Sequence, residues 1–352
     1  MNTLVRPEIL GLAEYHLAQY PHRIKLNQNE NPYELPAEIK REVLDRLAAQ
    51  RWSRYPAFIP QEQINLVAQH AGWVPEGTLL GNGSNDLLQL LFMALLERGK
   101  SVVISQPTFT LYKILARGLG ADVKEVAMQP DFRFNVPGII EGARDADAAM
   151  VVLCSPNNPT GTLLEEKEVV SVIESTAGLV VLDEAYVHFA PRSLRHLLER
   201  YDRLVILQTF SKAMGAAGLR FGYGLMDPAF ARQLNKLKLP YSVNIFTLLC
   251  AEVLIRRWDV IKGWIDIIVQ ERERVRAALS TIKCITVHGS NANFLLIEVD
   301  GHSPRDVFLR LAERGILIRD VSSYPHLEKG LRITIGTPEE NTALLSALQE
   351  VL

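Results

Sequence analysis

The feature that most constrains the fold is an alternation of short apolar β-type runs with helical patterns in the middle of the chain. Most of these runs are apolar throughout, which is typical of strands in a parallel sheet that is covered on both faces. The predicted strands are 101–105, 122–127, 148–154, 178–183, 204–208 and 222–226, and the helices between them are 84–98, 108–118, 164–175 and 193–201. This βαβ rhythm predicts an α/β domain with a large, doubly wound and mostly parallel sheet.

The pattern changes after Tyr241. The remaining elements predict a small α+β domain: a long helix 245–281, strands 284–288, 294–299, 316–319 and 331–335, and helices 304–314 and 338–351. We therefore expect an N-terminal arm (1–32), a large domain (33–245) and a small C-terminal domain (246–352), with the long helix as the hinge.

Composition excludes several classes of protein. With 352 residues the chain is long enough for two domains, and its net charge of −2 gives no basic field for nucleic acid or an anionic membrane. Cys154, Cys250 and Cys284 are odd in number and widely spaced, so we expect a reducing compartment, no disulfide framework and no metal site. Residues Met1–Glu8 do not have the pattern of a signal peptide, and the apolar stretch 87–96 is too short to span a bilayer. A cytoplasmic location is expected.

Lys212 is the most informative candidate for chemistry. It follows the predicted strand 204–208, has Thr209 and Ser211 beside it, and precedes Arg220 in a glycine-containing segment. A lysine taken alone is usually a solvated surface residue. In this setting, however, it can form a Schiff base with an aldehyde cofactor while the hydroxyls and the guanidinium hold a phosphate. That combination indicates pyridoxal phosphate.

The two preceding strands end in groups that suit the same cofactor. Asn158 lies in a proline-rich loop after strand 148–154 and can donate to an oxygen anion, although an Asx turn would explain the loop equally well. Asp183 ends strand 178–183 and can pair with a protonated pyridine nitrogen, while Tyr186 can reach the ring's phenolic oxygen. A helix-capping aspartate with a surface tyrosine is the alternative. Three strands that deliver suitable groups to one sheet edge favour a site.

Other segments supply candidate contacts with weaker signals. Gly83, Ser84 and Asn85 open the apolar helix 84–98, whose free N–H groups can bind phosphate, although an Asn-Gly turn with a serine cap is common. Phe109 can stack on a heteroaromatic ring, but core phenylalanines are more frequent. The chain contains neither a dinucleotide-binding nor a P-loop glycine motif.

Two arginines in the small domain are candidates for anion binding. Arg332 lies in the predicted strand 331–335, and Arg319 ends the strand 316–319. Arginine binds carboxylate or phosphate with two parallel hydrogen bonds. Each could instead be an outward-facing arginine of an edge strand.

Together these segments resemble the fold-type I pyridoxal-phosphate enzymes, and within them the histidinol-phosphate aminotransferase group. The resemblance covers nearly the whole chain. The segments that carry it are Leu26–Pro32, Arg54–Pro56, Gly81–Asp86, Pro107–Phe109, Asn158–Gly161, Asp183–Tyr186, Thr209–Lys212, Ala217–Arg220 and Leu331–Thr337.

The resemblance implies roles for residues around the cofactor ring. Lys212 is the Schiff-base lysine, and Asp183 pairs with the pyridine nitrogen. Asn158 and Tyr186 hold the phenolic oxygen, and Phe109 stacks on the ring.

It also implies a phosphate site made by the backbone amides of Ser84 and Asn85, by Thr209 or Ser211, and by Arg220. The group often has Asp-Glu where this chain has Asn85-Asp86. Backbone donors do not depend on that side chain, so the departure leaves cofactor binding as an expectation.

Further roles concern the substrate and the quaternary structure. Arg332 grips the substrate anion, with help from Arg319 and Tyr15. Tyr55 reaches the cofactor phosphate of the neighbouring subunit, which implies an obligate homodimer.

The implied activity is transamination between L-histidinol phosphate and 2-oxoglutarate, which gives imidazole-acetol phosphate and L-glutamate in histidine biosynthesis. An aromatic or broad-range aminotransferase and a threonine-phosphate decarboxylase on the same fold remain alternatives. A cofactor-binding transcriptional regulator is disfavoured, because the chain lacks a separate basic DNA-binding module. A purely structural α/β protein would require every motif above to be coincidental.

Overall fold

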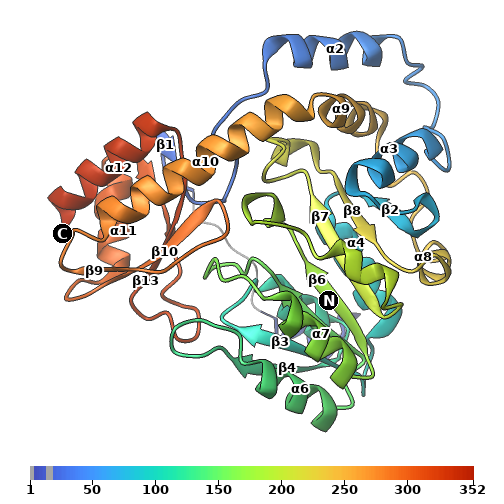
Figure 1. Ribbon diagram of the computed structural model, residues 1–352, viewed down its shortest axis with the longest axis horizontal. Coiled ribbons are helices and arrows are strands. Elements are labelled where there is room, and N and C mark those ends of the chain that lie inside the picture. Colours follow the sequence, from blue (N-terminus) through green and yellow to red (C-terminus); the bar gives the residue numbers. More distant parts are fainter. Residues whose placement is uncertain (1–3, 13–18) are drawn as a thin grey trace.

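The computed structural model describes residues 4–12 and 19–352, and this part of the chain forms a large sheet, a smaller sheet and a two-stranded sheet (Figure 1). The large sheet has seven strands in the order β2-β8-β7-β6-β5-β3-β4. Their bounds are β2 (Thr78–Gly81), β3 (Ser101–Gln106), β4 (Asp122–Ala127), β5 (Met150–Cys154), β6 (Leu179–Asp183), β7 (Leu204–Thr209) and β8 (Gly222–Leu225). Strands β3 to β7 pair in parallel, whereas β8 is antiparallel to both β7 and β2. The predicted α/β class with a mostly parallel sheet is confirmed.

Both faces of this sheet are buried, as the continuous apolar runs predicted. Alternate strand residues contribute to two separate hydrophobic cores: Val180 and Leu182 belong to one, and Leu179 and Val181 to the other. Helices α6 (Val136–Asp145) and α7 (Glu166–Ser175) contribute to the first core. The second core includes side chains of α4 (Ser84–Leu95), α5 (Leu111–Gly118) and α8 (Pro228–Leu234).

The C-terminal part forms a smaller antiparallel sheet in the order β12-β13-β10-β9. Its strands are β9 (Ile285–Val287), β10 (Phe294–Val299), β12 (Arg319–Asp320) and β13 (Gly330–Thr334). It lies with the helices α11 (Pro304–Glu313) and α12 (Pro338–Val351) on the left of Figure 1. The N-terminal segment joins this part, because β1 (Ile24–Lys25) pairs in parallel with β11 (Ile316–Leu317).

The structure divides the long helix expected over 245–281. Helix α9 (Ile245–Arg256) and helix α10 (Trp258–Leu279) meet at Arg257, whose backbone leaves the helical region at φ −104° and ψ 31°. The two helices have different surroundings, since nine residues of α9 are buried, Thr247 to Ile255 without interruption, whereas α10 is amphipathic. The Trp258 ring at the junction contacts the rings of His70 and His188.

Other expectations need local correction. The helix predicted over 193–201 is a short 3-10 helix, η4 (Arg195–Glu199). The strand predicted over 316–319 is divided between β11 and β12, which belong to different sheets. The sequence interpretation did not include α1 (Pro7–Leu10), α2 (Ala37–Ala48), α3 (Gln61–Ala71), α6, α8 or β2.

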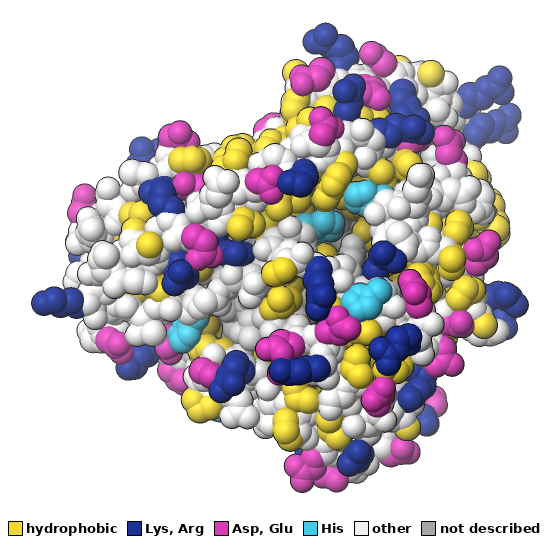
Figure 2. Space-filling view, viewed as in Figure 1, with side chains coloured by type: hydrophobic (Ala, Val, Ile, Leu, Met, Phe, Trp, Pro, Cys, Tyr) yellow, Lys and Arg dark blue, Asp and Glu magenta, His cyan; other side chains and the backbone are white. Residues whose placement is uncertain are grey.

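The face of the molecule shown in Figure 2 has a mixed charge distribution. On the face shown in Figure 2, Lys and Arg side chains are interspersed with Asp and Glu side chains. Over residues 4–12 and 19–352, no helix is long and apolar enough to cross a membrane.

Candidate active site

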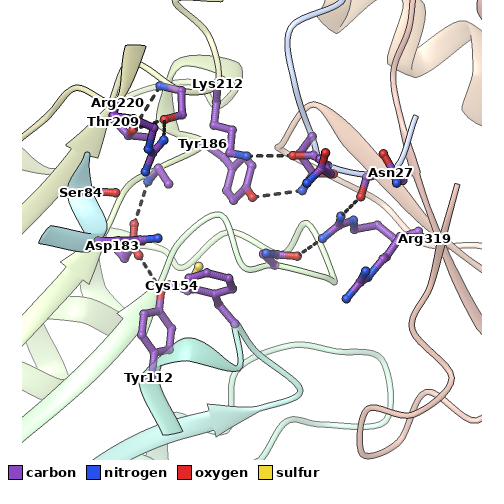
Figure 3. A pocket seen from close by; sticks show the side chains of 18 of the residues that line it. Asn27, Ser84, Tyr112, Cys154, Asp183, Tyr186, Thr209, Lys212, Arg220 and Arg319 are labelled. Atoms are coloured by element: carbon purple, nitrogen blue, oxygen red, sulfur yellow. Dashed lines mark hydrogen bonds between the residues drawn. The ribbon is translucent and has the colours of Figure 1, made fainter. Parts of the chain in front are cut away.

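A cavity of about 220 Å³ lies where three parallel strands of the large sheet end and the small sheet begins (Figure 3). Strand β5 ends at Cys154, which pairs in register with Asp183 at the end of β6, and β7 ends at Thr209. The carboxyl ends of parallel strands are where open α/β sheets bind ligands. The candidate residues that line the cavity are Ser84, Asn85, Phe109, Asn158, Asp183, Tyr186, Thr209, Ser211, Lys212, Arg220, Arg319 and Arg332.

One end of the cavity has the donors of an anion site. Arg220 Nη1 donates to Ser211 Oγ at 2.9 Å, and the Thr209 hydroxyl lies 3.1 Å from the same oxygen. Helix α4 begins beside them at Ser84, after Gly83 with φ +85°. A Cβ atom on Gly83 would come within 2.6 Å of Arg220 Nη2, so glycine allows the helix N-terminus and the guanidinium to approach each other. Two hydroxyls, a guanidinium and free helix N–H groups fit a phosphate.

Lys212 projects from the segment after β7 into the middle of the cavity. Its Nζ donates to the carbonyl oxygen of Gln28 at 2.9 Å and lies 5.7 Å from the centre of the Tyr186 ring. Burial, together with the nearby positive charge of Arg332, lowers the pKa of Lys212 to about 8. The unprotonated, nucleophilic form of this amine is therefore accessible near neutral pH.

Asp183 provides a carboxylate at the opposite wall. Its side chain is buried, with Oδ1 accepting from the Ala185 N–H at 3.1 Å and Oδ2 accepting from the Tyr112 hydroxyl at 2.6 Å. Burial raises the pKa of Asp183, and the hydrogen bond from Tyr112 opposes that rise. A cationic ligand atom beside this carboxylate would favour its ionised form, so the site fits a protonated ring nitrogen.

Asn158 and Tyr186 keep donors available for a ligand oxygen. Asn158 Oδ1 accepts from Arg332 Nη1 at 2.5 Å, which leaves its NH₂ group to donate. The Tyr186 oxygen accepts from Asn29 Nδ2 at 3.0 Å, which leaves its own hydrogen to donate. Burial raises the pKa of Tyr186, so the phenol stays protonated at neutral pH.

The small sheet supplies two guanidinium groups. Arg332 is buried, and its Nη2 donates to the carbonyl oxygen of Asn27 at 2.7 Å. Arg319, which pairs with Arg332 across β12 and β13, lines the same wall of the cavity (Figure 3). Two positive groups that line one wall of a pocket are suited to an anionic substrate.

Four of the candidates differ from the rest in their position. Gly83 does not line the cavity but precedes Ser84, which does. Tyr55 does not line the cavity: its side chain is 79% exposed, and its ring stacks on Tyr241 with centroids 4.5 Å apart. Asn85 borders the cavity but is itself exposed. Tyr15 lies outside the described residues.

The sequence interpretation gave no role to several residues of the cavity wall. These are Asn27, Gln28, Asn29, Tyr112, Cys154, Ala185 and Tyr324. Only the asparagine-rich N-terminal run gave a signal, and it did not reveal that consecutive residues contact Arg332, Lys212 and Tyr186. Residues 4–12 and 19–352 contain no group of three or more His, Cys, Asp or Glu side chains placed to bind a metal ion.

Comparison with known proteins places this geometry in context. The model of a family described as aminotransferase class I and II matches residues 21–348. The histidinol-phosphate aminotransferase of Chlorobaculum tepidum is 38% identical over 93% of this chain and 94% of its own length. That of Thermococcus gammatolerans is also 38% identical, over 97% of this chain and 96% of its own.

Solved structures are similar along the whole chain. Histidinol-phosphate aminotransferase from Sinorhizobium meliloti, solved in complex with pyridoxal-5'-phosphate, superposes with a TM-score of 0.88 at 25% identity, covering 98% of this chain and 96% of that one. An L-threonine-O-3-phosphate decarboxylase from Porphyromonas gingivalis shares the fold with a TM-score of 0.81 at 22% identity, covering 93% and 99%.

Proposed function

The chain belongs to the class I and II aminotransferases and is a pyridoxal-phosphate-dependent transaminase; we propose that it transfers the amino group between L-histidinol phosphate and 2-oxoglutarate. The products would be imidazole-acetol phosphate and L-glutamate, a step of histidine biosynthesis. The full-length relatives that carry the name histidinol-phosphate aminotransferase support this substrate pair.

We assign the cofactor contacts from the donors and acceptors of the cavity. When bound, pyridoxal phosphate supplies an aldehyde for the amino group and a ring that withdraws electrons. Lys212 Nζ would hold the aldehyde carbon, and Asp183 would face the ring nitrogen. Asn158 and Tyr186 would donate to the phenolic oxygen, and Phe109 would stack on the ring.

The phosphate of the cofactor would lie at the N-terminus of α4. Ser84 and Asn85 would donate from the backbone, and Thr209, Ser211 and Arg220 would donate from side chains. The hydrogen bond from Arg220 to Ser211 and the close approach of Gly83 to Arg220 support this assignment. Because the Asn85 side chain is exposed, its replacement of the more common aspartate leaves the backbone donors unchanged.

Proton transfer is assigned to Lys212. When the Lys212 amine is not attached to the cofactor, its Nζ would act as the base that takes a proton from the substrate and as the acid that returns it. A pKa of about 8 suits this role, since the amine can both accept and release a proton near neutral pH. The Asp183 carboxylate would favour a protonated ring nitrogen, and the buried Tyr186 hydroxyl would keep its hydrogen for the phenolic oxygen.

The observation that best supports a substrate with an oxyanion is the arginine pair at the small-sheet wall. Arg332 is held by Asn27 and Asn158, and Arg319 lies beside it. The same guanidinium fork can bind the phosphate of histidinol phosphate or the carboxylate of glutamate. Tyr15, outside the described residues, is a further candidate for this contact.

A half-reaction panel tests the activity. The holoenzyme is mixed separately with histidinol phosphate, glutamate, phenylalanine and threonine phosphate while the cofactor absorbance is followed. We expect conversion to the aminated cofactor with histidinol phosphate and with glutamate, and no release of CO₂.

No conversion with histidinol phosphate would refute the assignment. Preferred conversion with phenylalanine would indicate an aromatic aminotransferase. Release of CO₂ from threonine phosphate would indicate the decarboxylase, whose fold this chain shares.

We also propose that the enzyme is a cytoplasmic homodimer in which Tyr55 completes the phosphate site of the partner. Two segments, 52–59 and 237–241, expose large apolar or aromatic side chains, which supports this proposal. These side chains are Trp52, Tyr55, Phe58, Ile59, Leu237, Leu239 and Tyr241. Exposed groups of this kind mark interaction surfaces. Residues 33–245 would then form the cofactor domain, 246–352 the domain that closes over the substrate, and 1–32 the arm.

A further inference from the structure

Tyr112 is buried in the second core and ends at the cofactor cavity. Its relative exposure is 0%, and it lies in α5 with its ring edge-on to Phe109 at 5.6 Å between centroids. Its hydroxyl donates to Asp183 Oδ2 at 2.6 Å, as the dashed line in Figure 3 shows.

The contacts of Asp183 make this hydroxyl important. Among the described side chains, Tyr112 is the one that donates a hydrogen bond to the carboxylate, and the other donor is the backbone N–H of Ala185. Each carboxylate oxygen therefore has one donor. The two donors together fix the rotation of the carboxylate about the Cβ–Cγ bond of Asp183. The remaining lone pairs stay available for a ligand in the cavity.

The hydroxyl also acts on the charge of the carboxylate. A hydrogen bond to the ionised form stabilises that form, whereas burial favours the protonated form. The pKa of Tyr112 is well above its ordinary value because of burial and the nearby Asp183 charge, so the phenol keeps its proton and remains a donor. Cys154, whose pKa burial raises to about 12, is likewise a neutral neighbour.

We propose that Tyr112 is a positioning residue that holds Asp183 ionised and oriented for the cofactor's ring nitrogen. This inference rests on the role proposed for Asp183. It adds the residue that sets the orientation and the charge of the Asp183 carboxylate. A buried hydrogen bond to a charged group contributes more than a neutral one, and losing it exposes the carboxylate to the full effect of burial.

The first experiment compares two tyrosine-to-phenylalanine variants of the holoenzyme. Tyr112→Phe removes only the hydroxyl that reaches Asp183. Tyr223→Phe is the matched control: Tyr223 is 1% exposed, and its hydroxyl donates to Gln208 and not to Asp183. The readouts are the dissociation constant of pyridoxal phosphate and the NMR signal of its isotopically labelled ring nitrogen.

We expect Tyr112→Phe to weaken cofactor binding by about tenfold to a hundredfold, in line with the loss of a hydrogen bond to a charged group. The ring-nitrogen signal should shift toward the neutral form, and kcat should fall more than KM changes. Tyr223→Phe should leave the nitrogen signal unchanged. A wild-type dissociation constant and nitrogen signal in Tyr112→Phe would overturn the inference, and so would the same loss in both variants.

A double-mutant cycle with Asp183→Asn separates this inference from the proposed function. If Tyr112 acts through Asp183, adding Tyr112→Phe to Asp183→Asn should change the dissociation constant by less than about twofold. Equal effects in both backgrounds would overturn the inference alone. If Asp183→Asn itself binds and turns over like the wild type, the role of Asp183 fails, and the inference fails with it.

Discussion

At the scale of single residues, the chemistry depends on side chains whose surroundings change their protonation. Lys212 is a surface-type residue placed where burial and Arg332 disfavour its charge. Asp183 is placed where burial favours the neutral acid, whereas hydrogen bonds from the Tyr112 hydroxyl and the Ala185 N–H favour the ionised carboxylate. The cavity thus holds an amine that is easily deprotonated opposite a carboxylate that needs a cation. Perturbed groups that converge in a pocket are typical of active sites.

Replacing Lys212 tests the covalent and proton-transfer role together. Lys212→Ala should lower turnover by at least about ten-thousandfold, since both the attachment point and the general base are lost. The fold should persist, because the variant removes an amine whose charged form is disfavoured by burial. Turnover and the thermal unfolding curve are the two measurements, and full activity in the variant would remove the assignment.

The lowered pKa of Lys212 predicts how the apoenzyme takes up its cofactor. Only the neutral amine attacks an aldehyde, so the attachment rate should rise with pH and level off above about 8. An ordinary lysine would continue to gain reactivity up to about 10.4. Stopped-flow absorbance across this range measures the midpoint, and a midpoint near the ordinary value would contradict the environment described for Nζ.

At the scale of elements, the proposed phosphate site depends on close packing between β8 and the start of α4. A Cβ atom at Gly222 would lie 2.3 Å from the backbone nitrogen of Ser84 and 2.7 Å from the carbonyl carbon of Gly83. These atoms are backbone, so they cannot move aside as a flexible side chain would. Glycine at this position therefore fixes where the helix N–H groups point.

Gly222→Ala should displace the N-terminus of α4 and weaken cofactor binding by about tenfold or more, with an overpacking cost of about 1–3 kcal/mol in stability. Gly218→Ala is the matched control, because no atom lies within 4 Å of the added Cβ and the residue is exposed. The cofactor dissociation constant and denaturant unfolding measure the two effects. Equal affinity in both variants would argue against a phosphate at this helix end.

At the scale of the whole molecule, the cavity is assembled from parts that are far apart in the chain. Strand β6 of the large sheet contributes Asp183, the segment after β7 contributes Lys212, and the small sheet contributes Arg332. The N-terminal segment connects them, since it pairs with β11 through β1 and contacts Lys212 through Gln28. A movement of the small sheet relative to the large one would therefore change the position of the N-terminal segment and its hydrogen bond with Lys212.

Hybrid dimers test whether Tyr55 crosses to the partner. Tyr55→Phe should lower activity by about tenfold to a hundredfold through the lost hydrogen bond to a charged phosphate. Mixing this variant with inactive Lys212→Ala subunits under conditions of exchange should restore activity, because each hybrid dimer has one complete site. The same mixture without exchange is the control. If exchange restores nothing, Tyr55 acts within its own subunit or not at all.

The sequence by itself determined most strands of the large sheet and the ends at which they place the candidate site residues. Unbroken apolar runs such as Met150–Cys154 and Leu204–Leu207 are typical of buried strands, and the polar residues that follow them fall at one sheet edge. For that reason Lys212, Asp183 and Asn158 could be brought together before the structure was known. These signals are local, since periodicity and chain order carry them.

The tertiary structure alone decided the contacts between distant segments. The antiparallel direction of β8, the break at Arg257, the N-terminal residues on the cavity wall and the bond from Tyr112 to Asp183 have no local signature. Each depends on packing or hydrogen bonding between residues well separated along the chain. Tyr112 shows the reason clearly: its sequence context is that of any core aromatic on an amphipathic helix, and only the fold places a buried carboxylate beside its hydroxyl.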